Sequence, residues 1–218
     1  MNYNFSPLII FSFSFCWTGF LWGIAQFLTK GFLIGKRPFL VIPIALFAIG
    51  IFFYLFQLPT QFLIAYFLFF SALIVTMFTD ATTFLISQLV TLYLVPVGWI
   101  LANFQLLPIS PLSSIGGSLC GLLLLWLVKK ISQKFLQKEG LGQGDVDLLC
   151  FIGAFTGPLG CWITLMVGSI LASLVGLTYF IASRAKQDIM LPFGLFLSAG
   201  ALLYVFFHNE LIALFLPL

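Results

Sequence analysis

Long apolar runs that are almost free of charge constrain this chain more than any other feature of its sequence. Hydrophobic residues make up 62% of the 218 residues and charged residues only 7%. A water-soluble domain has about a quarter charged residues, so it would have far more polar surface than this composition provides. We therefore expect a polytopic membrane protein.

The apolar runs predict an all-α membrane helix bundle with about eight transmembrane helices. A helix needs about 20 apolar residues to cross about 30 Å of hydrocarbon, and continuous rather than alternating hydrophobicity favours helices over a barrel. The clearest runs cover residues 8–28, 38–56, 61–79, 88–104, 112–128 and 160–182, and shorter or interrupted runs cover 146–158 and 190–207. No long polar segment separates them, so residues 1–218 are predicted to form one integral membrane domain.

The basic residues predict the orientation of this bundle. Lys and Arg cluster after the first, fifth and seventh runs, so an eight-span topology places all nine on one face. The positive-inside rule makes that face cytoplasmic. The net charge of +3 then reflects topology and contact with the lipid bilayer, and no nucleic-acid binding is expected. The four cysteines lie in apolar runs without a CxxC pair, so no metal site is expected either.

Two of the six acidic residues, Asp80 and Asp145, stand at the ends of predicted spans on the same face. An ionisable group near hydrocarbon is costly and usually faces a partner or a polar cavity. If helix packing brings these carboxylates together, they can share one proton, as the two acids of aspartic proteases do. Two alternatives are structural: Asp145 as a helix N-cap, and Asp80 with Thr82 and Thr83 capping the bend after the third span.

Glycines surround Asp145 in the run Gly140-Leu141-Gly142-Gln143-Gly144-Asp145. Residues without side chains leave the backbone accessible to an extended peptide, so Gly142 and Gly144 are candidates for contact with a peptide substrate. A flexible connection is the structural alternative for the same glycines.

Three elements of the sequence resemble type IV prepilin leader peptidases, which are intramembrane aspartyl proteases of the GxGD type. Gly142-Gln143-Gly144-Asp145 resembles their GxGD signature, Thr79-Asp80 their first catalytic Asp, and Pro192-Phe193-Gly194-Leu195-Phe196 a late Pro-Phe-Gly-x-Phe element. The stretch 153–157 also resembles the small residues that follow GxGD in the family. The resemblance covers about residues 60–207, in matching order and spacing.

The resemblance implies an aspartic endopeptidase of the bacterial inner membrane. Such enzymes remove basic leaders from prepilins or pseudopilins at the cytoplasmic face, for pili, type II secretion or DNA uptake. By this likeness Asp80 and Asp145 are the catalytic pair. Candidate substrate contacts are Gly142, Gly144, Asp147, Pro192, Phe193 and Gly194.

The sequence departs from the family pattern in three places. Many members carry a zinc-binding domain after the first span and methylate the product with S-adenosylmethionine, but here that connection is only residues 29–38. We therefore expect proteolysis without a cofactor, with neither zinc nor methyl transfer. Ser87 and Gln88 replace a usual Pro-Asp, and Asp147 replaces a common Lys.

The sequence leaves open alternatives for the role of Asp147 and for the function of the whole chain. Asp147 is expected either to attract the basic residues of a leader or simply to stabilise the start of a helix through the helix dipole. The chain itself could instead be a non-catalytic relative that serves as a membrane assembly factor, or a GxGD protease with another membrane-protein substrate. A transporter is disfavoured because the acids lie near one face and no inverted repeat is visible.

Overall fold

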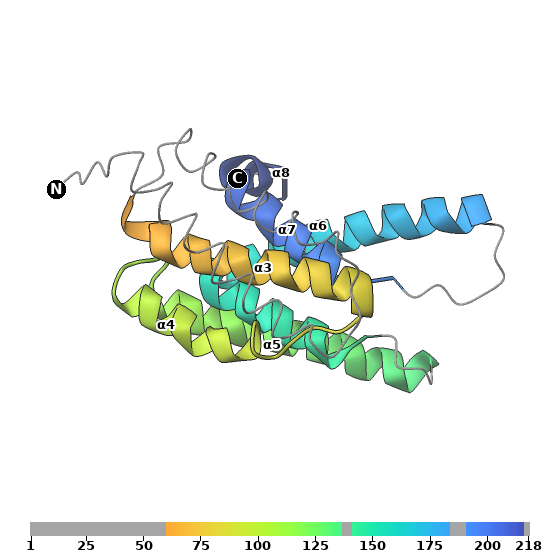
Figure 1. Ribbon diagram of the computed structural model, residues 1–218, viewed down its shortest axis with the longest axis horizontal. Coiled ribbons are helices and arrows are strands. Elements are labelled where there is room, and N and C mark those ends of the chain that lie inside the picture. Colours follow the sequence, from red (N-terminus) through yellow and green to blue (C-terminus); the bar gives the residue numbers. More distant parts are fainter. Residues whose placement is uncertain (1–59, 137–140, 184–190, 216–218) are drawn as a thin grey trace. The chain divides into compact units, whose positions relative to one another are not determined.

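The computed structural model describes residues 60–136, 141–183 and 191–215 (Figure 1). Every regular element in these ranges is helical. The chain divides into two compact units, residues 1–75 and 76–218. The predicted spans 8–28 and 38–56, and the short connection 29–38, lie outside the described residues.

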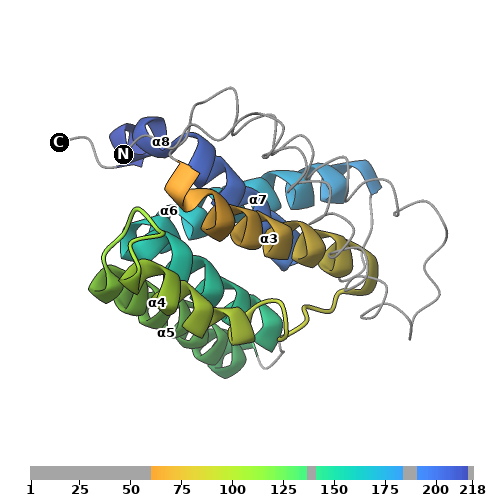
Figure 2. The same ribbon diagram turned by 60° about the vertical axis from the view of Figure 1, so that its left-hand side comes forward.

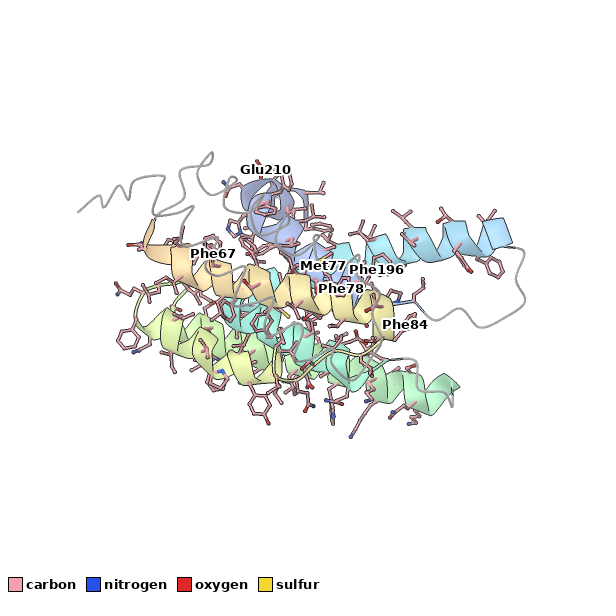
Figure 3. The ribbon with its side chains drawn as sticks, viewed as in Figure 1. Phe67, Met77, Phe78, Phe84, Phe196 and Glu210 are labelled. Carbon is pink, nitrogen blue, oxygen red and sulfur yellow. The ribbon has the colours of Figure 1, made fainter. Side chains whose placement is uncertain are left out.

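In the first unit, the described part comprises the 3-10 turn η2 (Thr60–Phe62) and the beginning of α3 (Leu63–Thr83). This part of α3 is rich in buried aromatic residues, including Phe67, which is labelled in Figure 3. The Tyr66 and Phe70 rings stack on the same face of the helix, with centroids 5.8 Å apart. The predicted span 61–79 thus corresponds to α3.

The second unit contains the end of α3 followed by η3 (Leu92–Leu94), α4 (Val95–Asn103), α5 (Pro111–Leu136), α6 (Gln143–Ser183), α7 (Phe193–Phe206) and α8 (His208–Phe215). α5 packs along α6, α4 contacts both, and α7 packs on α6 (Figure 2). Among the described residues, three helices are long and apolar enough to cross a membrane, or four if the bent pair α7 and α8 counts as one span. The count of eight spans stays a prediction.

The span predicted at 88–104 is shorter than expected. Helical structure begins only at Leu92 and ends at Asn103. α3 ends where Phe84 takes a left-handed conformation with φ of 55°, and residues 84–91 form a turn-rich connection, here called the 84–91 loop. Its apolar composition gives the hydropathy of a span although the backbone is not helical. Figure 3 shows Phe84 at the end of α3.

α6 is broken at Gly157, where φ is 75° and ψ is −179°. Glycine tolerates this conformation and Pro158, next in the chain, has no N–H to continue the helical hydrogen bonds. The two arms lead in different directions from the break (Figures 1 and 2). They correspond to the predicted runs 146–158 and 160–182, which the structure joins end to end without a loop.

The first arm of α6 packs unusually close to α5. A Cβ atom on Gly117 would lie 2.1 Å from the carbonyl oxygen of Gly153, so neither position has room for a side chain. The Ser114 hydroxyl donates a hydrogen bond to the Ala154 carbonyl across the same interface. Small residues that let helix backbones touch are the usual basis of helix association in membranes. This packing buries every residue from 145 to 157 and fixes the arm that begins with the GxGD sequence.

Candidate active site

Asp80 lies in the last turn of α3, and its carboxylate contacts the start of α7. The side chain is only 5% exposed. Its Oδ2 accepts a hydrogen bond of 2.9 Å from the backbone N–H of Leu195, and the amide of Gly194 also interacts with the carboxylate. These amides belong to the first turn of α7, whose own N-cap, Pro192, supplies no side-chain hydrogen bond. Asp80 therefore caps α7 from another helix, as anions do at helix N-termini.

This contact differs from the predicted alternative in which Asp80 caps the bend after the third span. Thr82 and Thr83 donate their hydroxyls to carbonyls of α3 itself, at Phe78 and Thr79. The Asp80 carboxylate points instead to α7, far away in the sequence. Its position thus depends on tertiary packing.

Asp145 is the third residue of α6, so the prediction of Asp145 as the N-cap is wrong by three positions. Helix α6 begins at Gln143 and the position before it is Gly142. The Asp145 Oδ2 accepts a hydrogen bond from the Gly142 N–H at 3.3 Å. A first-turn acid that reaches back to the capping residue is one half of a capping box and lies at the positive end of the helix dipole.

The two carboxylates share one electrostatic environment within the second unit. The charge of Asp80 acts on Asp145 repulsively, and the charge of Lys129, on α5, attracts it. Both acids are at least nine-tenths buried. That the two acids form a catalytic pair stays a prediction.

Ile86, in the 84–91 loop, contacts one glycine in each of two site motifs. A Cβ atom on Gly144 would lie 2.7 Å from the Ile86 Cβ, and one on Gly194 would lie 2.5 Å from the Ile86 Cδ1 and 3.0 Å from the Asp80 Oδ2. One apolar side chain therefore fills the space that both glycines leave. Gly144 is half-buried in this packing, whereas Gly142 is exposed. Substrate contacts by Gly142, Gly144, Pro192, Phe193 and Gly194 stay predictions.

Asp147 is 5% exposed and both of its oxygens accept hydrogen bonds. Gln88 Nε2 donates to Oδ2 at 3.1 Å, and Gln143 Nε2 donates to Oδ1 at 3.3 Å. Lys129 Nζ in turn donates to Gln143 Oε1 at 3.2 Å. A chain of polar contacts thus connects α5, the first turns of α6 and the 84–91 loop.

No role in this region was predicted for Ile86, Lys129 or Gln143, although Gln143 stands inside the GxGD motif. Gln88 stood out in the sequence only as a departure from a family pattern, and Asp147 both as such a departure and as a candidate substrate contact. Both positions depart from the family pattern, and two departures in one chain were the available signal that positions 88 and 147 contact one another. Ile86 had no such signal, because an isoleucine in an apolar run looks like any residue of a span.

Within the described residues, no group of three His, Cys, Asp or Glu side chains lies close enough together to hold a metal ion. Cys150 and Cys161 are buried and free, as expected of small apolar residues.

The described part of the chain is thus a set of apolar helices, at least three of them long enough to cross a membrane, with two buried acids on different helices. A family model described as "Type IV leader peptidase family" matches residues 67–181, more than half of the chain. The chain belongs to the type IV leader peptidase family.

Several curated proteins are similar to the chain over part of its length. A prepilin leader peptidase/N-methyltransferase of Legionella pneumophila is 31% identical over 144 residues, 64% of this chain and 48% of that protein. One of Pseudomonas putida is 32% identical over 97 residues, 44% of this chain and 34% of that protein. A type 4 prepilin-like proteins leader peptide-processing enzyme of Escherichia coli O78:H11 is 32% identical over 109 residues, 50% of this chain and 39% of that protein.

The chain therefore spans about a third to a half of the length of the relatives that it matches. No solved structure matches it significantly.

Proposed function

We propose that this protein is an aspartic endopeptidase that removes the leader from type IV prepilins or pseudopilins at the cytoplasmic face of the inner membrane, with Asp80 and Asp145 as its catalytic pair. The observation that supports the proposal is that two buried acids on different helices both have the same Ile86 side chain beside them, at Gly144 next to Asp145 and at Gly194 next to the Asp80 carboxylate, in a chain of the type IV leader peptidase family. The named activities of the similar proteins support the same substrate class.

The chemistry follows from two carboxyl groups that share one proton. The protonated group polarises the scissile carbonyl while the ionised one takes a proton from the attacking water, and the roles reverse as the amine leaves. Buried surroundings strengthen these electrostatic effects. Neither step requires a metal ion or a cofactor, and we propose that no methyl group is transferred.

Cleavage of a co-expressed prepilin tests this proposal. We expect the wild-type protein to shorten a tagged prepilin with an intact basic leader, and Asp80→Asn and Asp145→Asn each to lower the cleavage rate by at least about a thousandfold, because loss of one member disables a catalytic unit. Glu210→Gln, which removes an exposed acid on α8 (Figure 3), is the matched control and should leave cleavage unchanged.

Three results decide the outcome. Full-length prepilin with both Asn variants, at membrane levels equal to wild type, supports the proposal. Shortening by either variant at the wild-type rate contradicts the assigned pair. A wild-type protein that leaves every prepilin intact indicates a non-catalytic relative or a protease with another substrate. Mass analysis of the new N-terminus shows separately whether a methyl group has been added.

A further inference from the structure

The Gln88–Asp147 contact connects the two segments that carry the proposed catalytic acids. Gln88 belongs to the loop that follows Asp80, and Asp147 lies two residues after Asp145 on α6. Their side chains meet at 3.1 Å. The same loop places Ile86 against Gly144 and Gly194, beside both acids. The 84–91 loop therefore links the end of α3 to the first turns of α6 and α7.

The hydrogen-bond directions in this contact are fixed by Lys129. A lysine ammonium has only donors, so it requires the Oε1 of Gln143, and the Nε2 of Gln143 then points to Asp147. An ionised Asp147 has only acceptors and satisfies both Gln143 and Gln88. The contact is thus made by a buried carboxylate and a neutral amide, and exchanging the two chemical groups can preserve it.

We propose that Gln88 and Asp147 are positioning residues, which hold the Asp80 segment and the Asp145 segment at the separation that catalysis requires. This inference rests on the proposed function. It assigns Asp147 to the inside of the protein, where both oxygens already have partners, in place of direct contact with a substrate leader.

Burial and bonding decide between these two roles of Asp147. A carboxylate that pairs directly with a basic leader must be accessible from solvent, whereas Asp147 is 5% exposed and accepts a hydrogen bond from the protein on each oxygen. A contribution to the helix dipole alone would not need Gln88. The bond to the 84–91 loop is therefore the feature that a positioning role explains.

An isosteric exchange cycle tests the pair. Gln88→Glu sets two carboxylates against each other, and like charges at this distance repel. In the Asp147→Asn variant, the new Oδ1 can accept from Gln143 and the new Nδ2 can donate to Gln88. The Gln88 amide can rotate so that its oxygen accepts this hydrogen bond. In the double variant Gln88→Glu/Asp147→Asn, the new carboxylate at position 88 accepts from the new amide at position 147, so the hydrogen bond returns with its direction reversed.

We expect kcat for prepilin cleavage to fall about tenfold or more in Gln88→Glu, which corresponds to loss of one good polar contact. Asp147→Asn and the double variant should stay within about threefold of wild type. Gln133→Glu, the same change at an exposed glutamine on α5, controls for added charge and should leave kcat unchanged. Equal thermal unfolding midpoints across the set separate positioning from loss of fold.

The double variant gives the decisive comparison. Recovery of kcat in the double variant, at equal thermal unfolding midpoints, supports the inference, because a leader-binding Asp147 gives no reason for rescue and a purely structural contact would change the midpoints. Two results overturn the inference but leave the proposed function intact. In one, the losses of kcat in the two single variants add in the double variant; in the other, the Gln88→Glu protein is as active as wild type. A wild-type protein that cleaves no prepilin overturns the proposed function, and this inference with it.

Discussion

Asp80 and Asp145 are held in place by contacts of different origin. Asp80 accepts the amide of Leu195, which is 115 positions away in the sequence, whereas Asp145 accepts the amide of Gly142, three positions earlier. The first contact requires α3 and α7 to pack correctly, and the second forms within the first turn of one helix. The Asp145 side of the site is therefore preorganised by local structure, and the Asp80 side by tertiary structure.

Ile86 lies where these two sides meet, and the contacts of its side chain differ between them. Against Gly144, next to Asp145, it presents its Cβ, which the backbone holds in place. Against Gly194, next to the Asp80 contact, it presents its Cδ1, which can move by rotation about a side-chain bond. The two glycines consequently tolerate substitution to different degrees.

The largest effect is expected for Gly144→Ala. The new methyl group would lie 2.7 Å from the Ile86 Cβ, so the 84–91 loop must move away from α6. Overpacking of this kind costs about 1–3 kcal/mol, and we expect prepilin cleavage to fall at least about tenfold. Gly116→Ala on α5, whose added Cβ would meet only the Pro158 Cγ at an ordinary 3.8 Å, is the control and should change cleavage by less than about twofold. Equal losses in both variants would show that Ile86 does not determine the geometry.

A smaller effect is expected for Gly194→Ala, and it should be partly reversible. The methyl group would meet the Ile86 Cδ1 at 2.5 Å and the Asp80 Oδ2 at 3.0 Å. Ile86→Val removes only the Cδ1 atom, so it should recover the part of the lost activity that comes from Ile86, while the contact with Asp80 remains. The same Ile86→Val change should not recover Gly144→Ala, because the Cβ remains. Cleavage rates of the two glycine variants, each with and without Ile86→Val, measure this difference. Equal rescue of both glycine variants would contradict the account in which Ile86 contacts Gly144 through its Cβ and Gly194 through its Cδ1.

The sequence predicted the local features of this molecule better than the tertiary ones. The start of a helix near Asp145 follows from the glycines before it, and the break in α6 follows from Gly157-Pro158 between two apolar runs. Both depend on residues that are neighbours in the chain. The capping of α7 by Asp80 does not, because nothing near Asp80 in the sequence indicates that its partner is the amide of Leu195.

Hydropathy alone also misjudged residues 88–91, the second half of the 84–91 loop. Leu89 and Val90 are as apolar as residues of a span, so the predicted span began at 88. In the structure Leu85 and Leu89 are exposed, at 64% and 56%, and Ile86 packs on the two glycines. An apolar loop at the edge of a membrane protein has the composition of a helix, and only its contacts distinguish it.

The spatial proximity of Asp80 and Asp145 can be measured directly by cross-linking, independently of activity. The four native cysteines are first replaced, and Asp80→Cys and Asp145→Cys are introduced together. A protease site is inserted at residues 137–140, between the two new cysteines. Membranes that contain this protein are then treated with a short thiol-specific cross-linker. The control pair is Asp80→Cys with Glu210→Cys, which lies beyond the 14 residues of α7, about 20 Å of helix from the amides that Asp80 contacts.

We predict that the two fragments of the Asp80→Cys/Asp145→Cys protein stay joined after proteolysis, while those of the control pair separate. Fragments that separate as readily in both proteins would contradict the pairing of the two acids.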